Sequence, residues 1–219
     1  MGGLRMSNEQ GLLLDLPARM APAHTALLVV DMQNDFCGAG GYIDKVIGKD
    51  PAACSAVAVQ VNRLVDAARA RGGPVLWLRP NYANAGLPES MRAKLAERKI
   101  NDVCCAPGTW GYEWHGVQPA PDEPVLDKTC YDGFVATPLE SELHKKGIRS
   151  IVFAGVQTNV CVEATLRHAH ALGFYCVVPQ DCVASHTPPA HEATLNNVRF
   201  LFGDVTTLDD VIKAWAPAK

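Results

Sequence analysis

Hydrophobic residues gather in short continuous runs along the chain, and stretches with helical spacing of apolar side chains separate these runs. The runs predicted to be strands are residues 26–31, 74–79, 124–127, 149–154, 175–179 and 204–205. The stretches predicted to be helices are residues 57–71, 88–98, 137–146, 158–172, 188–200 and 208–215. Because strands that are apolar throughout alternate with helices, the sheet should be parallel and covered on both faces. The pattern predicts one α/β domain, a three-layer α/β/α sandwich with a mostly parallel central sheet.

The ends and the composition of the chain set the limits of this domain. We expect residues 1–22 to form an N-terminal arm and residues 23–219 to form the single domain. A protein that binds nucleic acid needs a basic surface, whereas this chain has a net charge of −3. No run reaches the ~18 apolar residues of a membrane span. No basic segment before a long apolar stretch marks a secretion signal. We therefore expect no nucleic-acid or membrane partner and a cytoplasmic location, with the eight cysteines as free thiols.

Three side chains with useful chemistry follow predicted strands: Asp31, Lys128 and Cys161. Ligands of an open parallel sheet bind outside the carboxyl ends of its strands. With Thr158 as N-cap, Cys161 would be the third helical residue, where backbone N–H groups are free and the helix dipole is positive. Both features favour a thiolate and so should lower the pKa of the thiol. The same N–H groups could stabilise a developing oxyanion. Taken singly, each residue has an ordinary structural explanation. Together, a thiol, a base and a cation are what nucleophilic catalysis requires.

The segments around these residues resemble a known family, the isochorismatase-like cysteine hydrolases. The matching segments are residues 26–36 (ALLVVDMQNDF), Lys128 and residues 155–165 (GVQTNVCVEAT), and the resemblance extends over about residues 24–215. It implies an open parallel sheet and a catalytic trio of Asp31, Lys128 and Cys161. It also implies a cis peptide before Gln157, which turns the Gln157 N–H toward the pocket. There the Gln157 and Cys161 N–H groups would form the oxyanion hole.

The chemistry expected from the resemblance is hydrolysis of a carbon–nitrogen bond. Cys161 would attack the carbonyl carbon of an amide or ureido group and form a thioester, which water then hydrolyses. Asp31 would accept the thiol proton and deliver it to the leaving nitrogen, and Lys128 would hold Asp31 ionised. Family members with Gly or Asp at the cysteine position are expected to hydrolyse vinyl ethers instead. A cysteine at this position therefore favours an amidohydrolase.

Further segments look most like the ureidoacrylate and biuret hydrolase branch of this family. These are residues 40–44 (GGYID), 108–112 (GTWGY) and 128–134 (KTCYDGF). Members of that branch cleave N-carbamoyl compounds, so ureidoacrylate, biuret or triuret is the expected kind of substrate. Residues 80–105 match nothing that can be assigned, and we expect them to set specificity. Two alternatives stay open: an amidase of a maleamate- or nicotinamide-like amide, and a non-catalytic binding protein of the same fold.

Several residues are candidates for contact with this small substrate. The candidate substrate-binding residues are Phe36, Asn81, Trp110, Tyr131 and Gln157, and Phe134 is a further candidate wall of the pocket. A small planar substrate suits a pocket with aromatic walls and a few polar groups. Residues 79–84 (RPNYAN) hold no histidine where nicotinamidases carry a metal site, so we expect no metal and no cofactor. The resemblance also implies a homodimer or homotetramer.

Overall fold

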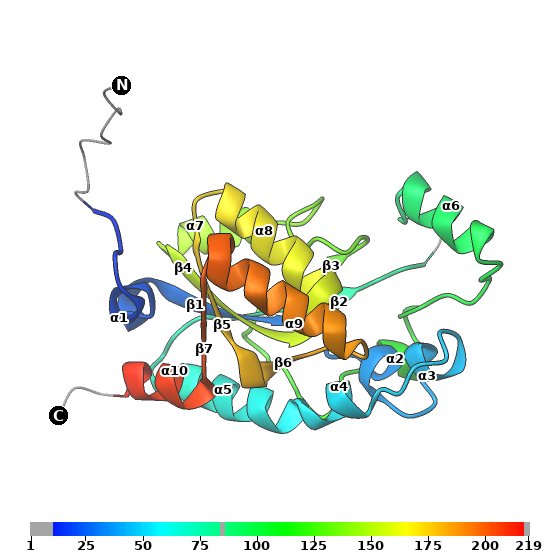
Figure 1. Ribbon diagram of the computed structural model, residues 1–219, viewed down its shortest axis with the longest axis horizontal. Helices are drawn as coiled ribbons and strands as arrows, with labels where there is room; N and C mark the ends of the chain where they lie inside the picture. The colour runs from blue at the N-terminus through cyan, green and yellow to red at the C-terminus, as the bar shows by residue number, and fades with distance from the viewer. Residues whose placement is uncertain (1–10, 84–85, 217–219) are drawn as a thin grey trace.

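The computed structural model describes residues 11–83 and 86–216, and within them seven strands form one sheet (Figure 1). The strands are β1 (Thr25–Val30), β2 (Val75–Pro80), β3 (Val125–Lys128), β4 (Ser150–Val156), β5 (Tyr175–Pro179), β6 (Val183–Ala184) and β7 (Asp204–Thr206). Their order is β3-β2-β1-β4-β5-β7, with β6 beside β4, and every pair is parallel. The predicted parallel sheet is confirmed. The first ten residues of the predicted arm and residues 217–219 of the predicted domain lie outside the described residues.

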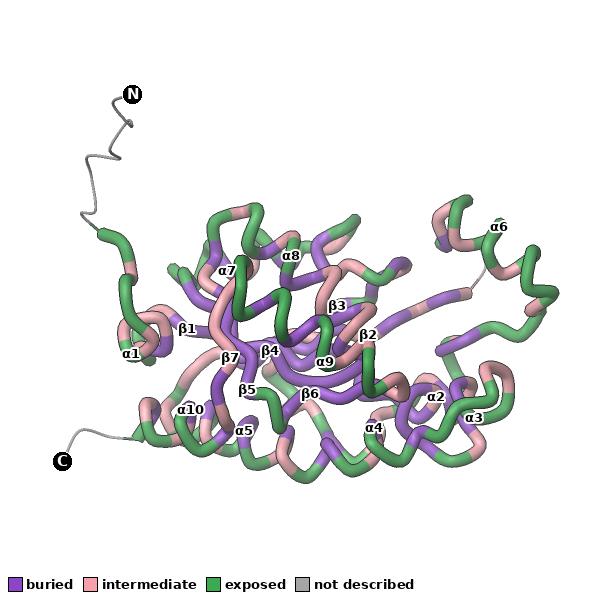
Figure 2. Tube along the Cα trace, in the orientation of Figure 1, coloured by how far each residue is buried: buried purple, intermediate pink, exposed green. Residues whose placement is uncertain are grey.

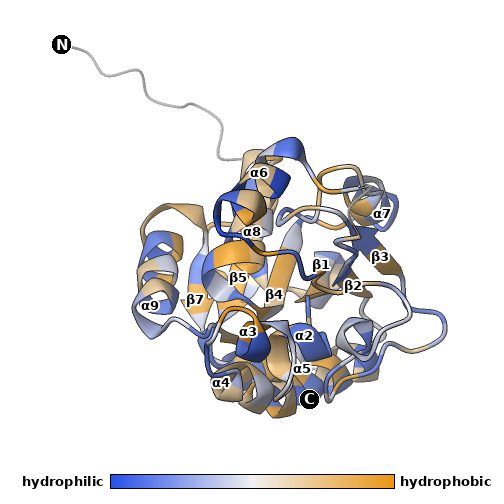
Figure 3. Cartoon of the chain, turned by 90° about the vertical axis from the view of Figure 1, so that its right-hand side faces the viewer, coloured by the Kyte–Doolittle hydropathy of each residue, from blue (hydrophilic) through white to orange (hydrophobic). Residues whose placement is uncertain are grey.

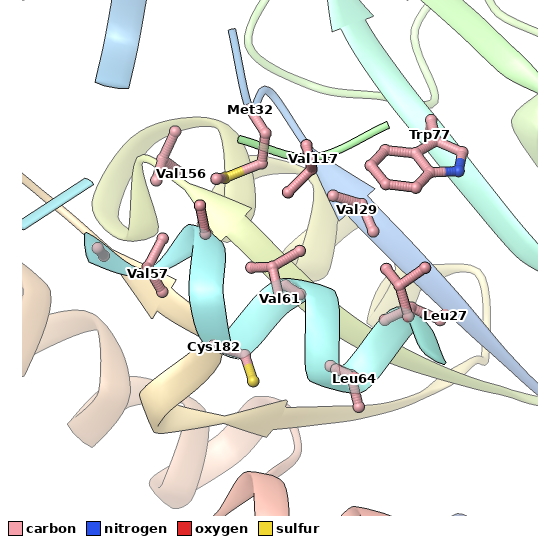
Figure 4. Close-up of a cluster of buried hydrophobic side chains, with 14 of the residues drawn as sticks. Leu27, Val29, Met32, Val57, Val61, Leu64, Trp77, Val117, Val156 and Cys182 are labelled. Atoms are coloured by element: carbon pink, nitrogen blue, oxygen red, sulfur yellow. The ribbon is translucent and has the colours of Figure 1, made fainter. Parts of the chain in front are cut away.

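Helices cover both faces of the sheet, which confirms the predicted three layers (Figure 1). One face carries α4 (Ala52–Ala56), α5 (Ala58–Ala70) and α10 (Leu208–Trp215), and the other carries α7 (Leu139–Lys145), α8 (Glu163–Ala171) and α9 (Pro188–Asn197). In α5, residues at helical spacing such as Val61 and Leu64 are buried against Leu27 and Val29 of β1 (Figure 4). Burial of such apolar faces is the main favourable term in folding.

The other helices are short, and most lie near the carboxyl ends of the strands. They are α1 (Leu16–Arg19), α2 (Asn34–Cys37), α3 (Tyr42–Lys45) and α6 (Glu89–Glu97). The helix α6 buries none of its residues, and it lies apart from the two helical layers (Figures 1 and 2). Its residues Met91 and Leu95 are partly buried and pack against the core cluster on the α5 side of the sheet.

Three of the predicted helices differ in detail from those in the structure. The stretch 57–71 corresponds to α5, and the short helix α4 directly precedes it. The stretch 188–200 divides into α9 and a π-helical turn, Val198–Phe202. The stretch 158–172 begins with a π-helical turn, Thr158–Val162, and continues as α8. Thr158 is thus not the N-cap, because its side chain is buried and its hydroxyl pairs with His191 Nδ1 at 2.9 Å.

Close packing of β1 and β4 fixes the backbone at the carboxyl edge of the sheet. Gly155 has φ +108°, and a Cβ at this position would overlap the carbonyl oxygen of Val30. Only glycine allows both this conformation and this approach. The next residue after β1, Asp31, has φ +53°, which is rare for a residue with a side chain. The two strands therefore end with their chains in unusual conformations at the same place.

Two expectations about the whole chain can be compared with the described residues. All eight cysteines lie within them, and all are free and buried, which confirms the prediction of free thiols. In the part of the chain that the structure describes, no helix is long and apolar enough to cross a membrane.

Candidate active site

An ion pair between two fully buried side chains forms the base of the candidate site. Asp31 follows β1 and Lys128 ends β3, so the lysine side chain reaches past the end of the intervening strand β2. Lys128 Nζ lies 2.8 Å from Asp31 Oδ2, and both side chains have 0% exposure. No described donor meets either carboxylate oxygen in regular hydrogen-bond geometry. The lysine therefore compensates the buried charge of Asp31.

The thiol of Cys161 completes the group of three that the sequence predicts. Cys161 lies in the π-helical turn between β4 and α8, and its side chain is buried and interacts with the Asp31 carboxylate. The sheet edge thus brings together residues that are far apart in the sequence, because β1, β3 and β4 end at the same edge. The predicted association of a thiol, a carboxylate and an ammonium group is present in the structure.

Tyr82 is a fourth member of this centre, and it was not identified from the sequence. Its hydroxyl accepts a hydrogen bond from Lys128 Nζ at 3.1 Å and lies 3.8 Å from Cys161 Sγ. The Cys130 carbonyl accepts a second hydrogen bond from Lys128 at 3.0 Å. Tyr82 comes shortly after β2, so the rule that led to the other three residues would also have found it. Within residues 79–84, the lack of a histidine had drawn attention, but Tyr82 had not.

Burial and neighbouring charges set the protonation of these groups. Burial raises the pKa of the Cys161 thiol, the charge of Asp31 raises it further, and Lys128 opposes both. The expected lowering of the thiol pKa is therefore wrong, because burial outweighs the start of the helix. Burial also raises the pKa of Asp31, and Lys128 opposes part of that rise. For Lys128, burial favours the neutral form, but the charges of Asp31 and Cys161 prevail and raise its pKa.

A cavity of about 260 Å³ opens onto the thiol. Among the predicted substrate-binding residues, Phe36, Tyr131 and Gln157 line this cavity. Its lining does not include Asn81 or Trp110, and Trp110 is half-exposed with its ring against Gly38. The substrate contacts of all five stay predictions. Phe134, the further candidate wall, is buried instead against Phe174, with ring centroids 6.2 Å apart.

The segment that matched nothing in the sequence supplies one wall of the cavity. Met91, Leu95 and Arg98, on or directly after α6, line it together with Asp102 and Cys104. Met91 and Leu95 of α6 therefore both pack against the core cluster on the α5 side of the sheet and line the cavity. This location agrees with the expectation that residues 80–105 set specificity, but the sequence pattern did not reveal which of them would face the thiol.

The peptide bond between Val156 and Gln157 is cis, as the family resemblance implies. The Gln157 side chain is already engaged: Oε1 accepts the His186 N–H at 3.0 Å, and Nε2 contacts Cys54 Sγ at 3.3 Å. Its backbone N–H has no hydrogen-bond acceptor among the described residues. Gln157 is thus better suited to offer its backbone than its side chain to a ligand.

One group of side chains in the described residues could present three metal ligands. Atoms of Asp35, Cys104 and Cys105 lie within 4.8 Å of one another. Both oxygens of Asp35 accept backbone hydrogen bonds, from the Tyr42 N–H at 3.1 Å and from the Cys105 N–H at 2.6 Å. The carboxylate therefore connects two loops, and binding a metal would compete with these bonds.

Comparison with known proteins agrees with this arrangement. A family model for the isochorismatase domain matches residues 25–210. The ureidoacrylate amidohydrolase RutB of Enterobacter sp. (strain 638) is 37% identical over 221 residues, which cover 92% of this chain and 96% of that protein. The protein of the same name from Methylorubrum extorquens AM1 is 39% identical over 210 residues, covering 87% and 84%. The crystal structure of a cysteine hydrolase from Pseudomonas syringae pv. phaseolicola 1448A has a TM-score of 0.77 and 25% identity, covering 89% and 93%.

The chain belongs to the isochorismatase family. The resemblance predicted from residues 26–36 and 155–165 is therefore confirmed. Within the family, its similarity to proteins named ureidoacrylate amidohydrolase extends over most of the chain.

Proposed function

We propose that the protein hydrolyses the carbon–nitrogen bond of a small ureido compound, with Cys161 as nucleophile, Asp31 as base and Lys128 as counter-charge. One observation carries this proposal: a buried Asp31–Lys128 ion pair lies beside a thiol at the base of a cavity for a small molecule. The residues supply each part of nucleophilic catalysis without a histidine.

The enzyme class rests on the relatives. They cover nearly the whole chain at 36–39% identity and are named ureidoacrylate amidohydrolases. The protein is accordingly an amidohydrolase, an enzyme that acts on carbon–nitrogen bonds other than peptide bonds. The ureido substrate and the cysteine mechanism are the finer parts that we propose.

The first half of the proposed reaction forms a covalent intermediate. As Cys161 Sγ attacks the ureido carbonyl carbon, its proton moves to the Asp31 carboxylate. The tetrahedral intermediate collapses, the carbon–nitrogen bond breaks, and Asp31 returns the proton to the leaving nitrogen. The product is a carbamoyl thioester on Cys161 and a free amine.

The second half releases the carbamoyl group. Asp31 takes a proton from a water molecule, which attacks the thioester carbon. As the carbon–sulfur bond breaks, Asp31 returns this proton to the sulfur, and carbamate leaves. Lys128 keeps Asp31 ionised until each proton transfer, and the Tyr82 hydroxyl donates to the sulfur while it carries negative charge. Backbone N–H groups of Gln157 and Cys161 hold the oxyanion. Loss of one such donor costs roughly 100- to 1000-fold in rate in comparable sites.

The test is turnover of a substrate panel by wild type and by Cys161→Ala, followed through ammonia release. The panel contains ureidoacrylate, biuret, triuret, maleamate and nicotinamide. We expect turnover of a ureido compound by wild type and none by Cys161→Ala, with unchanged folding by circular dichroism. Cys176→Ala, at another buried cysteine remote from the ion pair, is the matched control and should stay active.

Each other outcome has a definite meaning. Turnover of maleamate or nicotinamide in place of every ureido compound would replace the proposed substrate. Turnover that persists in Cys161→Ala would refute the nucleophile. An absence of turnover across the whole panel would favour a binding protein of the same fold.

A further inference from the structure

The charged side chains of the cavity wall are few, and they come from the segment after β2. The acidic and basic residues of the described lining are Arg98, Asp102 and His186. Burial lowers the pKa of His186, with Lys49 acting in the same direction, so its ring stays neutral at neutral pH. The remainder of the wall is apolar, aromatic, thiol or amide.

Arg98 continues the face of α6 that lies along the cavity. Met91, Leu95 and Arg98 are four and three residues apart, which puts them on one side of a helix. Lys94, which points elsewhere, pairs with Glu97 at 2.8 Å. Arg98 forms no ion pair or side-chain hydrogen bond with any residue in the described ranges 11–83 and 86–216, so its five donors are available to a ligand.

The charge of Arg98 acts on both sides of the cavity. Burial raises the pKa of Tyr42 to about 12, and Arg98 opposes that rise more strongly than Asp102 adds to it. Burial also raises the pKa of Tyr131, where Cys161 adds to the rise and both Lys128 and Arg98 oppose it. Arg98 therefore lines the same cavity as the aromatic walls Tyr42 and Tyr131 and the thiol of Cys161.

The lysine of the catalytic centre is not available to hold a further anion. Its three donors are used by the Asp31 carboxylate, the Tyr82 hydroxyl and the Cys130 carbonyl. A negatively charged substrate in this largely apolar cavity nevertheless needs a counter-charge, because an unpaired ion is costly to bury. Arg98 is the cation of the described lining that can supply it.

We infer that Arg98 is a carboxylate-binding residue and that the enzyme selects anionic ureido acids over neutral ureido compounds. This inference rests on the proposed function for the reacting end of the substrate. The ureido group lies at Cys161, and the far end carries a carboxylate that the planar guanidinium group binds through paired N–H donors. Ureidoacrylate belongs to this class of substrate, and biuret and triuret do not.

Kinetics of matched substrates test the selectivity. Wild type, Arg98→Met and Arg98→Lys are compared on ureidoacrylate, on its neutral amide and on biuret. Because Arg98 is exposed, an ion pair with a carboxylate there corresponds to roughly 5-fold in affinity. We expect Arg98→Met to raise KM for ureidoacrylate by about that factor while kcat changes little. The ratio of kcat/KM for ureidoacrylate to kcat/KM for its neutral amide should fall accordingly. Arg98→Lys should recover part of the loss.

Two control variants separate the role of the charge from a general effect on α6. Arg92→Met makes the same substitution on the same helix, at an exposed position outside the cavity lining, and should leave selectivity unchanged. Asp102→Asn removes the opposing charge from the same wall and should not weaken binding of the anion. An equal loss for anionic and neutral substrates in Arg98→Met would overturn the inference.

A binding measurement keeps this test independent of turnover. Calorimetry on the Cys161→Ala protein compares ureidopropionate with its neutral amide. Tighter binding of the acid, lost in the Cys161→Ala/Arg98→Met double variant, supports the carboxylate site even if the proposed reaction fails. Equal binding of acid and amide overturns the site, whether or not wild type hydrolyses ureido compounds.

Discussion

Removal of one hydroxyl group, in Tyr82→Phe, should slow the reaction without disturbing the fold. The Tyr82 hydroxyl lies 3.8 Å from Cys161 Sγ and accepts a hydrogen bond from Lys128 at 3.1 Å. Burial raises the pKa of this hydroxyl well above 10, and the charges of Cys161 and Asp31 add to the rise. The hydroxyl therefore keeps its proton, which it donates to the Cys130 carbonyl at 3.4 Å in the resting site and can donate to the sulfur when the sulfur carries negative charge.

The size of the effect follows from the charge on the acceptor. A hydrogen bond to a charged group contributes about 1.5–3 kcal/mol, and about 1.4 kcal/mol corresponds to tenfold in rate. Because the contact to sulfur is long, we expect the lower end, roughly a 10-fold fall in kcat. Lys128 keeps two of its three acceptors in the variant, so the free energy of unfolding should fall by only ~1 kcal/mol.

The assay is kcat and KM for the best ureido substrate, together with denaturant unfolding of the same samples. Tyr112→Phe is the matched control, since its hydroxyl also donates a hydrogen bond, to Asp127 at 3.0 Å, but lies outside the cavity lining. We expect normal kcat in Tyr112→Phe. Unchanged kcat in Tyr82→Phe would refute the stabilisation of the sulfur by this hydroxyl.

Three further outcomes follow from the same centre. Because burial raises the pKa of Asp31 above its ordinary 3.8 and the base must be ionised, kcat/KM should fall as the pH drops through that raised value, and a pH–rate profile measures it. Lys128→Met leaves a buried carboxylate unpaired and should lower the free energy of unfolding at neutral pH by about 3–5 kcal/mol, as measured by denaturant titration. The double variant Asp31→Asn/Lys128→Met removes that charge and should recover the lost stability. Since three side chains supply nucleophile, base and counter-charge, prolonged dialysis against a chelator should leave ammonia release unchanged.

The fold and the three central residues were predictable because they depend on patterns that the chain expresses locally. Continuous apolar runs identify buried parallel strands, and parallel strands carry their ligands beyond their carboxyl ends. Asp31, Lys128 and Cys161 each follow such a run, so their meeting required only the rule for the sheet edge. The order of the strands was not needed for that prediction.

The remaining features depend on three-dimensional contacts that no local pattern expresses. Thr158 has the residue type of an N-cap, but its hydroxyl pairs with His191, which is distant in the sequence. The thiol pKa depends on how completely later elements cover Cys161. Arg98 looks like any exposed helical arginine, and only the position of α6 beside the cavity distinguishes it from Arg92. The sequence could single out residues 80–105 but could not show which of them face the cavity.

The protonated resting thiol is a consequence of the charge balance at the centre. Lys128 is the cation beside Asp31, so this buried pair is neutral, and a resting thiolate on Cys161 would add an uncompensated negative charge. In the proposed reaction the sulfur therefore loses its proton to Asp31 only as it attacks, when the negative charge develops on the substrate oxygen beside the N–H donors proposed for the oxyanion. A thiol of high pKa is also the more nucleophilic once deprotonated. In the proposed reaction the protein thus stabilises negative charge in the transition state rather than on the resting thiol. Interactions that are stronger in the transition state than in the ground state are the ones that raise a rate.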